Sequence, residues 1–149
     1  MTNLDPKNIA NCLRNFQSFD RSKARRRLTD EDFTPLEIVN MMLDEYPVEC
    51  WGDPENIFID NSCGNGNILS EIVIRKLNAG LDLETALSTI RGVEFEEDNA
   101  NECRERLLCG QEHLRHIVEK NIVCADALTY NYCFGEPETF GNDLFTVID

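Results

Sequence analysis

Hydrophobic residues occur along this chain in short runs that alternate with amphipathic segments. The runs at 57–60, 90–95 and 121–128 predict strands. Between them, apolar residues recur every three or four positions at 68–78, and a second helix is expected after Asn99, to about Gln111. Because strands that alternate with helices form parallel sheets flanked by helices, the sequence predicts an α/β fold.

The remaining elements are shorter or less regular. Residues 1–20 predict a weak amphipathic helix, and 82–87 predict a short helix capped by Asp82. Gly80 is expected to end the helix at 68–78. The apolar run at 144–149 predicts a fourth strand.

A stronger helix signal lies just before the first predicted strand. Thr34 is the predicted N-cap, Pro35 the first helical residue, and Glu37 completes a capping box. Phe33 and Ile38 are spaced as a hydrophobic staple. The helix is expected to run to about Tyr46, with apolar positions that include Ile38, Met41, Met42 and Tyr46.

Composition indicates one globular domain, with 149 residues of which 42% are hydrophobic and 28% charged. No apolar run reaches the length of a membrane span, and the N-terminus lacks a signal-peptide pattern. The seven cysteines form no C-x-x-C pair and no Cys/His ligand spacing, which argues against disulfides and against a metal site. A reducing, cytoplasmic location is expected. Six of the cysteines are interpreted as core residues: Cys12, Cys50, Cys103, Cys109, Cys124 and Cys133.

The net charge of −14 argues against nucleic-acid binding by the whole surface. Residues 1–28 nevertheless form a basic arm, whereas 29–149 form the acidic α/β domain. The arm suits either a contact with the DNA backbone or docking on its own domain, and the sequence does not separate these. His113 and His116 are interpreted as surface residues.

The segment from Asp60 to Gly66 combines an acid at a strand end with a glycine-containing loop and a following helix. Glycines let the backbone approach a bound molecule and adopt positive φ. Asp60 would repel a phosphate, so a ligand with an ammonium or sulfonium group fits better. The alternative is an ordinary turn between a strand and a helix.

The letters D-N-S-C-G-N-G-N at 60–67 resemble the first motif of class I S-adenosylmethionine (SAM) methyltransferases, and the adenine-N6 DNA methyltransferases most closely. Asn61 replaces the usual proline. The segment F-T-P-L-E-I-V at 33–39 is similar to the one that precedes this motif in the same family. The resemblance implies a cofactor site that includes Thr34, Pro35, Asp60, Cys63, Gly64 and Gly66, with Thr34 and Pro35 against the methionine carboxylate of SAM.

The later strands extend the resemblance. An acid at the tip of a second strand is placed to bond ribose hydroxyls, and G-V-E-F-E puts Glu94 there. Glu94 could also be a solvated strand-end acid. The resemblance places Phe95 beside the adenine ring of SAM. It places Asp126 at the adenine amine and Ala127 at the ring edge.

The resemblance implies a Rossmann-like SAM methyltransferase fold that is incomplete at its C-terminal side. The family's catalytic N/D-P-P-Y/F motif does not occur, so no catalytic residue is predicted. We expect the SAM-binding part of an adenine-N6 DNA methyltransferase of the restriction-modification kind. The alternatives are a free-standing SAM-binding or regulatory protein, and an acidic interaction protein. A sheet edge left open by the missing half predicts a homo-oligomer or a partner subunit.

Overall fold

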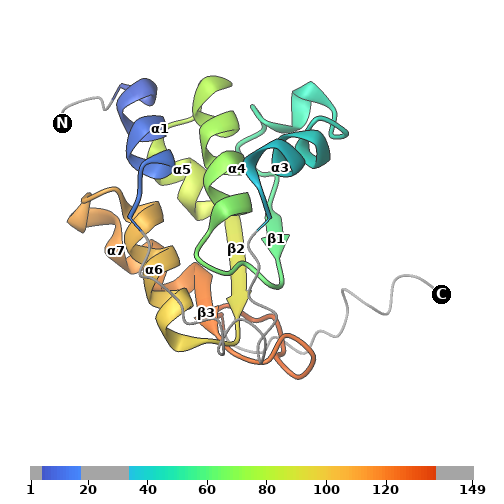
Figure 1. Cartoon of the computed structure of the whole chain (residues 1–149), viewed down its shortest axis with the longest axis vertical. Helices are drawn as coiled ribbons and strands as arrows, with labels where there is room; N and C mark the ends of the chain where they lie inside the picture. The colour runs from blue at the N-terminus through green and yellow to red at the C-terminus, as the bar shows by residue number, and fades with distance from the viewer. Residues whose placement is uncertain (1–4, 18–33, 137–149) are drawn as a thin grey trace.

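The computed structural model describes residues 5–17 and 34–136 (Figure 1). Its centre is a parallel sheet in the order β1-β2-β3, formed by Phe58–Asp60, Ile90–Glu94 and Ile122–Cys124. The helices are α1 Pro6–Arg14, α3 Leu36–Leu43, α4 Asn67–Asn78, α5 Leu83–Ser88, α6 Glu97–Leu108 and α7 Arg115–Asn121, with 3-10 turns at Val48–Cys50 and Glu112–Leu114. The predicted α/β class with helices flanking a parallel sheet is confirmed, and it is compatible with a Rossmann-like fold.

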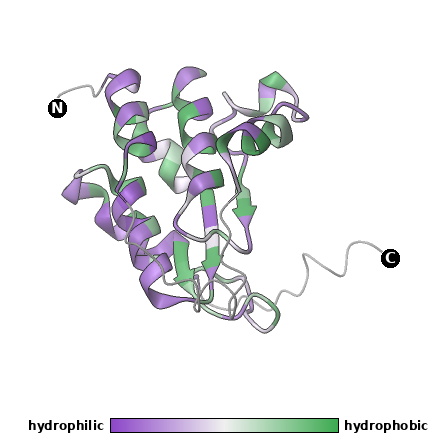
Figure 2. Cartoon of the chain, viewed as in Figure 1, coloured by the Kyte–Doolittle hydropathy of each residue, from purple (hydrophilic) through white to green (hydrophobic). Residues whose placement is uncertain are grey.

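The sheet has one well-covered face. Phe58, Ile90 and Ile122 are buried on the face that packs against α4, α6 and α7. In Figure 2, β1 and β3 are largely green and β2 is mixed, whereas α6 and α7 carry hydrophilic purple. The opposite face is only partly covered: Ile59 is 56% exposed, while Phe134, from the segment after β3, is buried and lies 5.9 Å from the Arg91 guanidinium.

Helix α1 packs into the same core as the sheet. Ile9 and Leu13 are buried, and Arg14 forms two 2.9 Å hydrogen bonds with the carboxylate of Glu71 on α4. The helical part of the basic arm is therefore docked on the α/β body. The arginine-rich stretch that follows, the boundary at residue 28 and the predicted strand at 144–149 lie outside the described residues.

The prediction for the start of α3 is wrong by one residue. Pro35, not Thr34, is the N-cap, since its ψ of 149° is extended and the first helical residue is Leu36. No side chain caps this end, so the predicted capping box is absent, and Phe33 lies outside the described residues. The helix also ends earlier, at Leu43. Its buried side chains are Val39 and Leu43, which lie on the side toward α4, whereas the apolar positions selected from the pattern are exposed: Ile38, Met41, Met42 and Tyr46.

The other boundaries lie close to those expected. Asp82 caps α5 by accepting a hydrogen bond from the Thr85 amide, and Gly80 follows α4 with a φ of +103°. The third strand is shorter than predicted and ends at Cys124, because the chain turns at Asp126. Within the part of the chain that the structure describes, no helix is both long and apolar enough to cross a membrane.

The interpretation of the six cysteines as core residues is only partly right. Cys103 is buried, but Cys12 and Cys124 are exposed, and the other three are half-buried. Cys124 ends β3, which is an edge strand of the described sheet, and Cys12 is exposed although its thiol hydrogen-bonds to that of Cys109 at the end of α6.

Candidate functional site

The residues singled out from the sequence come together at the carboxyl ends of the strands. Asp60 pairs with Gly92 in the sheet, and Glu94 pairs with Cys124. The amide of Cys63 donates to the carbonyl of Val93, so the loop after β1 lies beside the end of β2. Figure 1 shows this edge below α4, where the arrow of β2 ends and α6 begins.

The glycine loop is shaped by two sulfur atoms as well as by its glycines. Gly64 and Gly66 adopt φ values of +55° and +93°, which other residues rarely take. A Cβ at Gly66 would lie 3.0 Å from the sulfur of Cys103, and a Cβ at Gly92 would lie 2.8 Å from the sulfur of Cys63. The hydrogen bond between these two thiols, together with burial, raises the pKa of Cys63. Cys63 is therefore an inert packing residue below the loop.

Within the part of the chain that the structure describes, Asp60 has one carboxylate oxygen that is hydrogen-bonded and one that is not. One oxygen, Oδ1, accepts from the amide of Ser62 at 3.1 Å. The other, Oδ2, is buried and has no hydrogen-bond partner within the described residues. Burial raises the pKa of Asp60, and the nearby charge of Glu94 raises it further. A buried, unpartnered carboxylate oxygen is costly alone and is relieved by a cationic donor such as an ammonium group.

Glu94 links two segments of backbone at this edge. Its Oε2 accepts from the amide of Gly64 at 2.7 Å, and its Oε1 accepts from the amide of Glu96 at 3.1 Å. Each carboxylate oxygen has a second lone pair, so Glu94 retains capacity to accept a hydroxyl hydrogen bond. The two carboxylates make this edge negative, which favours cations over phosphates.

The residues after β2 and β3 flank the same edge. Phe95 is 70% exposed, which leaves a ring face open. The amide of Ala125 donates to the carbonyl of Glu94 at 2.9 Å and so brings Asp126 and Ala127 to the end of β2. Asp126 is exposed, and its Oδ1 accepts from the amide of Leu128 in a local turn. This turn fixes the position of Asp126 just after the end of β3.

Thr34 and Pro35 reach the site through Asn67, the first residue of α4. The side-chain Nδ2 of Asn67 donates to the carbonyl of Thr34 at 3.4 Å. The same side chain accepts from Arg106 through Oδ1 at 2.6 Å. The sequence analysis did not single out Asn67 or Arg106. Asn67 could have been noticed from its place after Gly66, but nothing in the sequence indicates that Arg106 on α6 reaches the loop.

No match to known proteins is found for this chain, whether it is compared with protein families, with curated proteins or with solved structures. The interpretation of this edge therefore depends on the residues themselves. Among residues 5–17 and 34–136 there is no group of three or more His, Cys, Asp or Glu side chains arranged to hold a metal ion.

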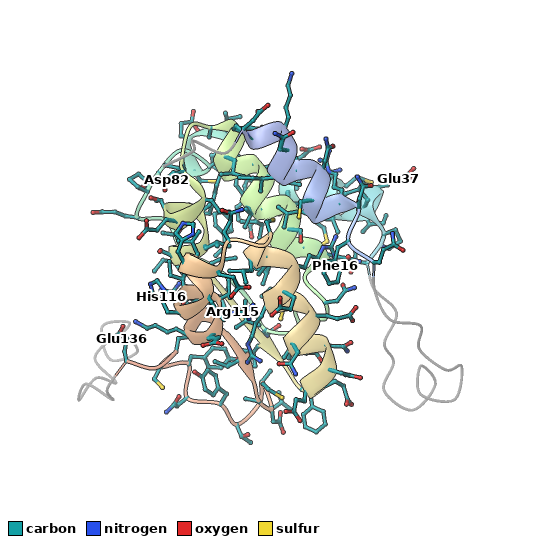
Figure 3. All side chains as sticks on the ribbon, turned by 90° about the vertical axis from the view of Figure 1, so that its left-hand side faces the viewer. Phe16, Glu37, Asp82, Arg115, His116 and Glu136 are labelled. Atoms are coloured by element: carbon teal, nitrogen blue, oxygen red, sulfur yellow. The ribbon has the colours of Figure 1, made fainter. Side chains whose placement is uncertain are left out.

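The two histidines do not belong to this edge. Both are exposed, and they lie in the 3-10 turn before α7 and in α7 itself. Figure 3 shows His116 far from Glu37, which marks the start of α3. His113 and His116 therefore supply no acid–base group to the candidate site.

Proposed function

We propose that this edge of the sheet binds SAM, as the cofactor-binding part of an adenine-N6 DNA methyltransferase. The observation that carries the proposal is the buried Oδ2 of Asp60, which lacks a partner beside a glycine loop of positive φ. The ammonium group of an amino acid supplies the missing donor. The glycines allow the ligand to approach the backbone closely.

Each part of SAM has a matching group on the protein. The ammonium group is assigned to Asp60, the ribose hydroxyls to Glu94, and one face of the adenine to the exposed ring of Phe95. The methionine carboxylate is assigned to the Thr34–Pro35 segment. Asp126 and Ala127 are assigned to the adenine edge, and Cys63, Gly64 and Gly66 form the loop beneath the ligand.

Bound SAM would supply an electrophilic methyl group on a sulfonium centre, while these residues bind and orient it. Transfer to a flipped adenine requires a base pocket of the N/D-P-P-Y/F type. No such motif occurs in these 149 residues. We therefore assign methyl transfer to a further segment or to a partner subunit. In this proposal the basic arm contacts DNA. The protein acts in the cytoplasm of a cell with a restriction-modification system.

Calorimetric titration with SAM tests the proposal. We expect wild-type protein to bind, and Asp60→Asn and Glu94→Gln each to weaken binding by about 1 kcal/mol or more, which is about fivefold. The matched control is Glu119→Gln, because Glu119 is an exposed acid on α7, and it should leave the affinity unchanged.

Absence of binding by folded wild-type protein would contradict the proposal. The alternative function would then be protein recognition by the acidic surface, whose net charge is −14. If SAM binds but addition of the DNA-methylating half of such an enzyme gives no methylation, the chain is a free-standing SAM-binding protein.

A further inference from the structure

Arg106 on α6 is a buried cation whose hydrogen-bond acceptors, within the residues that the structure describes, are neutral. It is 9% exposed, and burial lowers the pKa of its guanidinium. Nε donates to the carbonyl of Leu13 at 2.8 Å, and Nη1 donates to Oδ1 of Asn67 at 2.6 Å. Because burying a charge without a directly bonded counter-ion is costly, an apolar residue would serve packing better. We therefore look for the role of Arg106 in the two groups to which it donates hydrogen bonds, the Leu13 carbonyl and the Asn67 side chain.

Asn67 connects two parts of the candidate site, the glycine loop and the Thr34–Pro35 segment. Asn67 is the residue directly after Gly66, so it fixes where the glycine loop becomes α4. Its Nδ2 holds the carbonyl of Thr34, one residue before the N-cap of α3. A continuous chain of hydrogen bonds thus runs from Leu13 through Arg106 and Asn67 to Thr34, and it joins α1, α6, α4 and the segment before α3.

This chain of bonds replaces local capping. The N-cap residues of α3 and α4, Pro35 and Gly66, form no side-chain cap. Neither helix start is therefore fixed by a side-chain cap of its own, and the Asn67 side chain supplies a direct hydrogen bond between the two starts. Arg106 in turn fixes the side chain of Asn67 by donating a hydrogen bond to its Oδ1.

We propose that Arg106 is a positioning residue for the amino-acid end of SAM. It acts through Asn67, and it holds Thr34–Pro35 at the correct place relative to Asp60 and the glycine loop. This inference rests on the proposed function, since it concerns the same site. It also predicts that the adenosine end, which is assigned to Glu94, Phe95 and Asp126, does not depend on Arg106.

Titration with two ligands separates positioning from a general structural role. SAM has both ends, whereas 5′-methylthioadenosine lacks the amino-acid end. We expect Arg106→Met to weaken SAM binding about tenfold, which corresponds to one lost set of hydrogen bonds, and to change the affinity for 5′-methylthioadenosine less than about twofold. The matched control is Arg75→Met, because Arg75 joins α4 to the far end of α3 through Asn40 and Asp44. It should change neither affinity.

Asn67→Ala keeps the test decisive if Arg106→Met does not fold. It should reproduce the selective loss of SAM affinity, and where both single variants fold, the double variant should be no weaker than either. Equal weakening of both ligands, or no weakening of SAM, would overturn the role of Arg106 while leaving SAM binding intact. Failure of wild-type protein to bind SAM would instead overturn the proposed function, and this inference with it.

Discussion

The carboxyl group of Asp60 favours binding of a cationic ligand, but when it is ionised it lowers the stability of the native state. Its pKa is raised above the ordinary value of 3.8, chiefly by burial, so the native state holds this proton more firmly than the unfolded state does. The stability that Asp60 contributes therefore falls as the pH rises from about the unfolded pKa through the native pKa. When the side chain is ionised, its buried charge is a cost to the native state that a cationic ligand would remove.

We predict that Asp60→Asn raises the free energy of unfolding by about 1 kcal/mol near neutral pH, because it removes a buried charge whose Oδ2 lacks a partner. The gain should shrink toward about pH 4, because Asp60 of the wild-type protein takes up a proton there, whereas the amide of the Asp60→Asn variant carries no charge at any pH. Urea unfolding at the two pH values measures it. A gain that is equal at both pH values would contradict the electrostatic explanation.

The cysteines differ in reactivity because they differ in burial. Cys12 and Cys124 are exposed, whereas Cys63 and Cys103 are buried free thiols that are hydrogen-bonded to each other below the glycine loop. We predict that iodoacetamide modifies the exposed pair at least about tenfold faster than the buried pair in the native protein. Mass spectrometry of peptides measures the rates, and the same reaction in urea is the control that should remove the difference.

At the scale of elements, the glycine loop, α4 and β3 pack closely against β2 at Gly92, a residue that has no side chain. A Cβ at Gly92 would lie within 3.0 Å of Cys63, Leu69 and Ile122, which belong to the loop, α4 and β3. The close approach of these elements thus depends on a strand residue without a side chain. The requirement is steric, because the φ of Gly92 is not in the left-handed region.

We predict that Gly92→Ala lowers the free energy of unfolding by about 2 to 3 kcal/mol through overpacking. Gly80→Ala is the matched control: its φ of +103° strains the backbone, but nothing lies within 4 Å of the new Cβ, so the loss should be about 1 kcal/mol. Thermal or urea unfolding compares the two. If Cys63→Ala restores no stability to Gly92→Ala, the sulfur is not the group that is overpacked.

For the whole molecule, the sheet leaves apolar surface uncovered on the β1 side. Within the described residues, β1 pairs only with β2. Ile59 in β1 and Ile57 just before it are 56% and 51% exposed. Tyr46 contacts the ring of Phe58 at 5.4 Å, so the residues that follow α3 lie against the same strand. An exposed strand edge with apolar neighbours favours association.

We predict that the protein is a dimer or larger at micromolar concentration and that Ile59→Lys shifts it toward monomer. Leu128→Lys is the matched control, because Leu128 is 94% exposed but follows β3 at the other side of the sheet. Sedimentation velocity measures both. A monomeric wild-type protein would contradict the prediction.

The sequence by itself determined the three strands of the described sheet, the main helices and which residues lie at the strand ends, because periodicity and glycine placement are local properties. Only the tertiary structure decided which face of α3 is buried, that Glu71 and Lys76 are buried in α4, and that Arg106 reaches Asn67. Contacts such as Arg106 with Leu13 join residues that are 93 positions apart. The pattern within one element cannot encode them, since they depend on how the helices pack against one another and on the parallel sheet.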